Sequence, residues 1–117
     1  MLVDTSIWVD HLRQRDPRLA ELLEEGAVWT HPFAVGELAC GNLATRSEVL
    51  ELIGALPSAP VADHDEVLAF VEGRRLMGLG LGLVDVHLLA SAVLASLPLW
   101  TADKRLSEVA RALNVHP

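Results

Sequence analysis

The amino-acid sequence predicts one α/β domain, in which a short, mostly parallel sheet of about four to five strands has helices on both faces. Its 117 residues, 51% hydrophobic and 21% charged, fit a single globular domain with a real core. Short apolar runs alternate with longer amphipathic segments, and no repeat or linker divides the chain, so we expect a single domain over 1–117. Strands that are separated by helices need crossover connections, which favour parallel pairing.

The predicted strands are short apolar runs. Proline has no backbone N–H, so Pro60 indicates an edge position or the start of its strand. The runs are Met1–Asp4, Ala27–Thr30, Ala59–Ala62, Leu97–Thr101 and a last short run at Val115.

Capping and stop residues delimit the predicted helices. Asp16 is an N-cap candidate with Pro17 in the first turn, and Gly26 closes that helix. The segment Leu83–Ser96 is apolar on nearly every side, which predicts a buried helix. The other predicted helices begin at Thr5 or Ser6, at Pro32 (ending near Cys40), at Thr45 or Ser47, at Asp63 or Asp65, and at Asp103.

The charge balance excludes some classes of protein. Nine Lys and Arg face 16 Asp and Glu, which gives a formal charge of −7. This excess argues against a protein that passively coats DNA or membranes, but not against a nucleic-acid enzyme whose metal ions neutralise its carboxylates. Cys40 is the only cysteine and we expect it to be a small buried hydrophobe. With no disulfide, signal peptide or membrane span expected, the sequence favours the cytoplasm.

Four acidic residues lie in apolar surroundings. Asp4 and Asp103 each follow a predicted strand, and ligands of open α/β sheets bind beyond the carboxyl ends of strands. Asp85 lies in the predicted buried helix, and Glu37 lies between apolar residues of another. Each also has an ordinary interpretation, as a helix cap, a helix-start carboxylate or an exposed glutamate. Because all four are expected at one end of one sheet, we favour a shared site.

A shared site of this kind needs cations. Two carboxylates about 5 Å apart repel by roughly 3 kcal/mol at an effective dielectric of about 20. Oxygen ligands without histidine or cysteine suit Mg²⁺ or Mn²⁺. Such ions activate water and stabilise a phosphoryl oxygen, so hydrolysis of a phosphodiester is the chemistry that the pattern favours.

The sequence resembles the PIN-domain family, and within it the VapC-type ribonuclease toxins. The matching motifs are Val3-Asp4-Thr5-Ser6, Gly36-Glu37-Leu38, Asp85 with His87-Leu88-Leu89-Ala90-Ser91-Ala92, and Thr101-Ala102-Asp103. The resemblance covers essentially the whole chain. It implies a PIN-like three-layer sandwich and a Mg²⁺-dependent endoribonuclease, the toxin of a type II toxin–antitoxin system, which cleaves RNA through metal-activated water.

Roles of individual residues also follow from this resemblance. Ser6 and Thr101 match the hydroxyl positions that support the first and last aspartates, and Leu106 departs from the aromatic residue that relatives often have. Family members commonly form homodimers and are inhibited by an antitoxin, so both partners are expected. The positions that match the catalytic and metal-binding acids are Asp4, Glu37, Asp85 and Asp103.

Basic residues are candidates for contact with RNA. The guanidinium group of arginine forms paired hydrogen bonds with phosphate oxygens, although exposed arginines are more often simply solvated. With no tyrosine and two phenylalanines, the chain offers little base stacking, so we expect recognition of RNA mainly by shape and backbone. The residues cluster at Arg13, Arg15 and Arg18 and in the pairs Arg74–Arg75 and Lys104–Arg105, of which Arg13, Arg15, Arg74, Arg75 and Lys104 are the candidate contacts.

Other interpretations remain open. The glycine-rich run Gly78–Leu83 lacks the residues of a nucleotide loop and predicts a flexible turn before the Asp85 helix. The main alternative function is a regulatory module without catalysis, whose acidic cavity binds a cation or an arginine of a partner. A phosphatase or phosphoacceptor that uses Asp4 as nucleophile is disfavoured, because Ser6 replaces the second aspartate of its motif.

Overall fold

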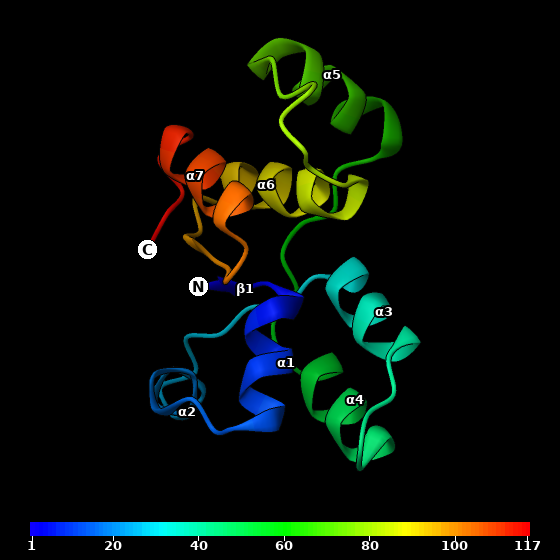
Figure 1. Ribbon diagram of the computed structural model, residues 1–117, viewed down its shortest axis with the longest axis vertical. Coiled ribbons are helices and arrows are strands. Elements are labelled where there is room, and N and C mark those ends of the chain that lie inside the picture. Colours follow the sequence, from blue (N-terminus) through cyan, green and yellow to red (C-terminus); the bar gives the residue numbers. More distant parts are fainter.

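The computed structural model describes all residues of the chain, Met1–Pro117. Helices dominate it (Figure 1), and it has two very short strands. No helix is both long enough and apolar enough to span a membrane. In chain order the elements are β1 (Leu2–Val3), α1 (Thr5–Arg13), α2 (Pro17–Glu24), α3 (Pro32–Cys40), α4 (Arg46–Gly54), α5 (His64–Arg74), α6 (Leu83–Ala95), β2 (Leu99–Trp100) and α7 (Lys104–Ala112).

The sheet is parallel, as predicted, but the prediction of four to five strands is wrong. Only β1 and β2 are paired strands, in the register Leu2↔Leu99 and Val3↔Trp100. The predicted strands near 29 and 59 contribute single parallel bridges, Leu2↔Trp29 and Thr30↔Ser58. Near the C-terminus, the Leu99 N–H donates to the carbonyl of Val115 at 2.6 Å. Each of these segments pairs with its neighbour at only one or two residues, which is too few hydrogen bonds to form a further strand of the sheet.

The alternation of side chains along the strands creates two cores. Leu2 and Leu99 belong to one apolar cluster, which α6 and α7 complete with residues such as Leu88 and Leu106. Val3 belongs to the other cluster, which α1, α3 and α4 complete. Figure 1 shows the same division, with α5, α6 and α7 on one side of β1 and α1 to α4 on the other. The prediction of helices on both faces of the sheet is therefore confirmed.

Most helix starts lie where the capping residues predicted them. The Asp16 carboxylate accepts the Arg18 N–H at 2.9 Å, and Pro17 begins α2. Asp63 caps α5 in a reciprocal capping box with Glu66. The predicted burial of Cys40 is wrong, because its side chain is exposed. Helix α3 buries Ala34 and Leu38, and a residue two positions after Leu38 faces away from that side.

Candidate active site

The carboxyl ends of β1 and β2 bring Asp4 and Thr101 together. Asp4 follows β1 directly and is only 6% exposed. Its Oδ2 atom accepts hydrogen bonds from the hydroxyls of Ser6 and Thr101, each at 2.7 Å. Each hydroxyl has one proton, and both protons are used on Asp4, so the 3.3 Å separation of the two hydroxyl oxygens is a contact without a shared proton. The resemblance predicted a supporting role for these two hydroxyls.

The same hydroxyls also hold the segment that carries Asp103. Thr101 Oγ1 accepts the backbone N–H of Asp103 at 3.0 Å, and Ser6 Oγ accepts that of Ala102 at 2.9 Å. The Asp103 side chain is the N-cap of α7 and accepts the Leu106 N–H at 3.0 Å through Oδ1. The N-cap interpretation and the site interpretation of Asp103 are thus compatible, since one carboxylate oxygen is used in the cap and the other is not.

Asp85 lies in the first turn of α6, where its Oδ2 atom accepts the Gly82 N–H at 2.9 Å. Burial raises the pKa of this carboxyl, and the negative charges of Asp4 and Asp103 raise the pKa further, against the opposing effect of the Gly82 hydrogen bond. Asp4 and Asp103, from separate parts of the chain, therefore lie close enough for their charges to act on Asp85. A cation nearby would favour the ionised form of Asp85.

Glu37 joins this group from α3. Its Oε1 atom accepts the hydroxyl hydrogen of Thr5 at 3.0 Å, and Thr5 directly follows Asp4. The Glu37 side chain is exposed, so it lies at the rim of the site and carries no large burial cost. Hydrogen bonds thus connect Asp4, Asp103 and Glu37 through neighbouring hydroxyls, and a charge effect connects Asp85 to Asp4 and Asp103. All of these contacts lie where α1, α6 and α7 begin.

The free carboxylate oxygens define what the site can bind. Within the protein, Asp4, Asp85 and Asp103 each use one carboxylate oxygen in hydrogen bonds, and the other oxygen of each is unused. No three Asp, Glu, His or Cys side chains converge closely enough to hold one ion as they stand. Carboxylates without a counter-charge repel one another, and here each is also held by its own hydrogen bond. The donor set still matches Mg²⁺, which prefers oxygen ligands and retains several waters.

The predicted RNA contacts lie on several different elements of the fold. Lys104 directly follows Asp103. Arg13 ends α1 nine residues after Asp4, about 13 Å along a helix axis. Arg15 lies in the following loop, and Arg74 and Arg75 end α5, where the guanidinium of Arg74 lies 5.8 Å from the ring centre of Phe70. No hydrogen bond or ion pair joins these four arginines to the carboxylates, so their role stays a prediction.

Sequence reasoning missed a pair of buried histidines, His31 and His87. His31 is the N-cap of α3, and its Nδ1 atom accepts the Phe33 N–H at 3.0 Å. His87 of α6 is 4% exposed, and its ring centre lies 6.3 Å from that of His31 and 4.4 Å from that of Phe33. The pair joins the helices that carry Glu37 and Asp85. The only sequence signal was His31 immediately before Pro32, a position typical of an N-cap.

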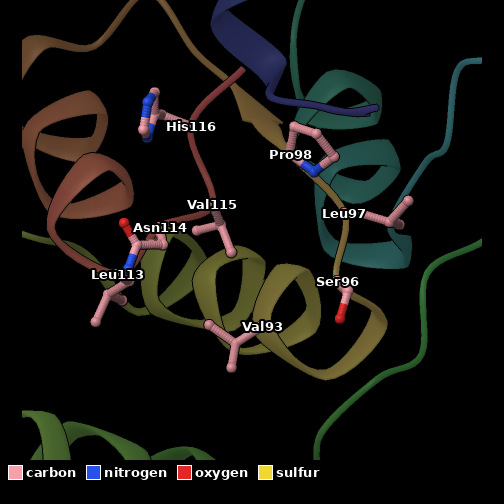
Figure 2. Close-up of a pocket in the computed structure, with 8 residues that line it drawn as sticks. All are labelled: Val93, Ser96, Leu97, Pro98, Leu113, Asn114, Val115 and His116. Carbon is pink, nitrogen blue, oxygen red and sulfur yellow. The ribbon is translucent and has the colours of Figure 1, made fainter.

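Two surface hollows of the molecule lie away from the acids. One of about 250 Å³ is formed by the end of α6, the segment before β2 and the C-terminal segment (Figure 2). Pro98, which lines this hollow, precedes β2, whereas Thr101 follows β2. The hollow and the carboxylates therefore lie at opposite ends of this strand. Another, of about 480 Å³, lies between the end of α1 and the loop after α3. Neither is lined by any of the four acids.

Comparison with known proteins gives the family. The PIN-domain family model matches residues 1–112, nearly the whole chain. The chain is a PIN-domain protein. Two curated relatives, both called Ribonuclease VapC32 and found in two strains of Mycobacterium tuberculosis, are 50% identical to it over 107 residues, which cover 91% of this chain and 86% of each relative. The predicted family is therefore confirmed, and the PIN match spans all four acidic positions.

Proposed function

We propose that this PIN-domain protein is a Mg²⁺-dependent endoribonuclease and the toxin of a type II toxin–antitoxin system. The observation that carries the proposal is the group of carboxylates around the carboxyl ends of β1 and β2, with Asp4 held by two hydroxyls. Half of the aligned residues are identical to relatives named as ribonucleases, which supports RNA as the substrate. Asp4, Glu37, Asp85 and Asp103 are the proposed catalytic and metal-binding residues.

The residues that would hold the metal are those with an unused carboxylate oxygen. Asp4 and Asp103 are the proposed direct ligands, while Asp85 and Glu37 bind through water or orient the attacking water. When bound, Mg²⁺ supplies a Lewis acid at the phosphoryl oxygen and lowers the pKa of water. The hydroxyls of Ser6 and Thr101 fix the Asp4 carboxylate, and the helix caps fix those of Asp85 and Asp103. Such positioning limits the reorganisation that the reaction requires.

Removal of divalent metal tests the enzymatic part of the proposal. The purified protein is incubated with total RNA in Mg²⁺, in EDTA, and in EDTA followed by excess Mg²⁺. We expect cleavage in the first and third mixtures and none in the second, because unneutralised carboxylates repel the phosphate. Binding without cleavage in Mg²⁺ would instead favour the alternative, a regulatory module that uses its acidic surface to bind a cation or an arginine.

Substitution of Thr101 tests the role of the hydroxyls. Thr101→Val keeps the shape of the side chain but removes the hydrogen bond to Asp4 and leaves the Asp103 N–H without its acceptor. Loss of a group that orients metal ligands typically costs about 10- to 100-fold in activity, and we expect a decrease in this range. Thr101→Ser, which keeps the hydroxyl, is the matched control and should retain most of the cleavage rate. Equal rates for both variants would contradict the proposed role.

The proposed partners follow from the family and from exposed apolar side chains. We propose that a cognate antitoxin inhibits the enzyme and that the chain forms a homodimer. Leu12 and Phe33 are 42% and 38% exposed, and Leu12 lines the hollow at the end of α1. Co-expression with the protein encoded by a small adjacent reading frame should suppress cleavage, and light scattering of the purified chain measures its oligomeric state. The proposed RNA contacts are Arg13, Arg15, Arg74, Arg75 and Lys104.

A further inference from the structure

A close contact joins α7 to the turn before α6. The turn contains two glycines in the left-handed region, Gly78 with φ 73° and Gly80 with φ 77°. A Cβ atom built on Gly80 would lie 2.6 Å from Nη1 and 3.2 Å from Cζ of Arg105, whereas one built on Gly78 would meet nothing within 4 Å. The guanidinium of Arg105 therefore lies directly against the backbone at Gly80, in space that any side chain there would occupy.

This contact joins two segments that each carry one of the site acids. Arg105 is the second residue of α7, and the N-cap of that helix is Asp103. Gly80 lies two residues before Gly82, whose N–H holds the Asp85 carboxylate. The guanidinium thus bridges the two segments that position Asp103 and Asp85. Its place is set by the turn on one side and by the start of α7 on the other.

The guanidinium of Arg105 also has N–H groups that no residue of the protein uses. Three other arginines have partners within the protein: Arg18 lies over the ring of Trp100 at 4.9 Å, Arg74 lies 5.8 Å from the ring centre of Phe70, and Arg46 donates to the Gly41 carbonyl. Arg105 is exposed and has no comparable hydrogen bond, ion pair or aromatic partner. A guanidinium with unused N–H groups suits an oxyanion, because its planar fork matches phosphate oxygens.

We propose that Arg105, placed by the glycine at position 80, binds a backbone phosphate of the RNA next to the phosphodiester that is cleaved. The proposal rests on the ribonuclease function proposed above and adds a positioning residue to it. A chain of formal charge −7 with a cluster of carboxylates repels a polyanion, so a fixed cation at the edge of the cluster helps to align the strand. Contact with the turn restricts the long side chain before RNA binds, which reduces the entropy lost on binding.

The salt dependence of RNA binding separates this role from a structural one. Binding of a labelled, mixed-sequence single-stranded RNA is measured over a range of KCl in Mg²⁺, with every protein carrying Asp4→Asn to prevent cleavage. Loss of one phosphate contact should make the slope of log K against log salt shallower by about 0.7 in Arg105→Ala. Arg105→Lys keeps the charge and should keep the slope. Arg111→Ala, on the last turn of the same helix, is the matched control and should bind like the parent.

Substitution of the two glycines provides a second test, because an alanine at either position has a similar unfavourable φ. Gly80→Ala and Gly78→Ala both place a Cβ at a positive φ, but only the first displaces Arg105. We expect Gly80→Ala to reproduce the shallower slope of Arg105→Ala, and Gly78→Ala to keep the slope of the parent. When each is combined with Arg105→Ala, Gly80→Ala and Gly78→Ala should give double variants of equal RNA affinity.

The outcomes distinguish this proposal from the proposed function. If the wild-type protein cleaves RNA but Arg105→Ala binds with unchanged affinity and slope, the role of Arg105 is refuted and the nuclease stands. If Arg105→Ala weakens binding without a change of slope, the residue only supports the turn, and the phosphate contact is refuted as well. If the wild-type protein neither binds nor cleaves RNA in Mg²⁺, both proposals fail together.

Discussion

Asp4→Asn is expected to abolish RNA cleavage and leave the fold intact. The asparagine carbonyl oxygen can still accept the two hydroxyl hydrogen bonds that reach Asp4 Oδ2 from Ser6 and Thr101, so the shape and the bonding of the buried side chain are kept. What is lost is the negative charge that a cation needs. Transition-state stabilisation by a bound metal is worth several kcal/mol, so its loss should lower the rate by on the order of 10³-fold.

Thermal unfolding and cleavage are measured on the same preparation. We expect the Tm of Asp4→Asn to equal or exceed that of the wild type in EDTA, because the substitution also removes a charge that repels Asp85. Asp16→Asn is the matched control: Asp4 is the N-cap residue of α1 and Asp16 that of α2, but Asp16 lies outside the carboxylate group. Its cleavage rate should not change. Cleavage at the wild-type rate by Asp4→Asn would remove the basis of the proposed mechanism.

Local rules predicted the helices of this protein well. Asp16 with Pro17, and Asp63 with Glu66, satisfy backbone N–H groups through side chains that are close in sequence, so their helix starts can be recognised without tertiary structure. Strand length was not predictable in this way. Whether the chain near Thr30 pairs at one residue or at several depends on how closely neighbouring segments approach, and residues near 30 and 58 meet at a single bridge. That distance is set by the packing of helices on both faces.

The position of residues after predicted strands selected candidate acids, and the family resemblance selected the two hydroxyls of Ser6 and Thr101. The rule that ligands bind beyond strand ends selected Asp4 and Asp103, and the structure links both to Thr101. The rule says nothing about which oxygen of each carboxylate is already in use. Nor could the sequence reveal that Arg105 lies against Gly80, since the two are 25 positions apart (105 minus 80) and their contact depends on how α7 docks against a turn.

The buried histidine pair has a different physical consequence from the acids. His31 is completely buried, and its Nδ1 atom must stay unprotonated to accept the Phe33 N–H. Protonation would break this cap and place a positive charge at the N-terminus of α3, where the helix dipole opposes it. Accordingly, burial lowers the pKa of His31 from 6.5 to about 4, with a further contribution from the charge of His87. Burial also lowers the pKa of His87, and the charge of His64 lowers it further.

Acid is therefore expected to destabilise the protein through His31. Between pH 6.5 and about pH 4 the unfolded chain binds a proton at this residue that the folded chain does not, so the free energy of unfolding falls as the pH falls. Each pKa unit corresponds to about 1.4 kcal/mol, which gives a loss of about 3 kcal/mol over this range. The contribution of His31 to the free energy of unfolding is fully present above pH 6.5. It is lost by about pH 4, and below this pH it changes no further. Urea unfolding at several pH values measures the decrease.

His31→Asn isolates the contribution of this histidine. Asparagine is a strong N-cap and can accept the Phe33 N–H, but it does not titrate in this range. The smaller side chain leaves a void, so the variant should be less stable than the wild type at neutral pH. As the pH falls to 4, the difference between the two proteins should shrink by about 3 kcal/mol, because only the wild type gains the proton on unfolding. His116→Gln removes an exposed histidine and should follow the wild-type curve. A constant difference between His31→Asn and the wild type across this range would show that acid acts through other groups.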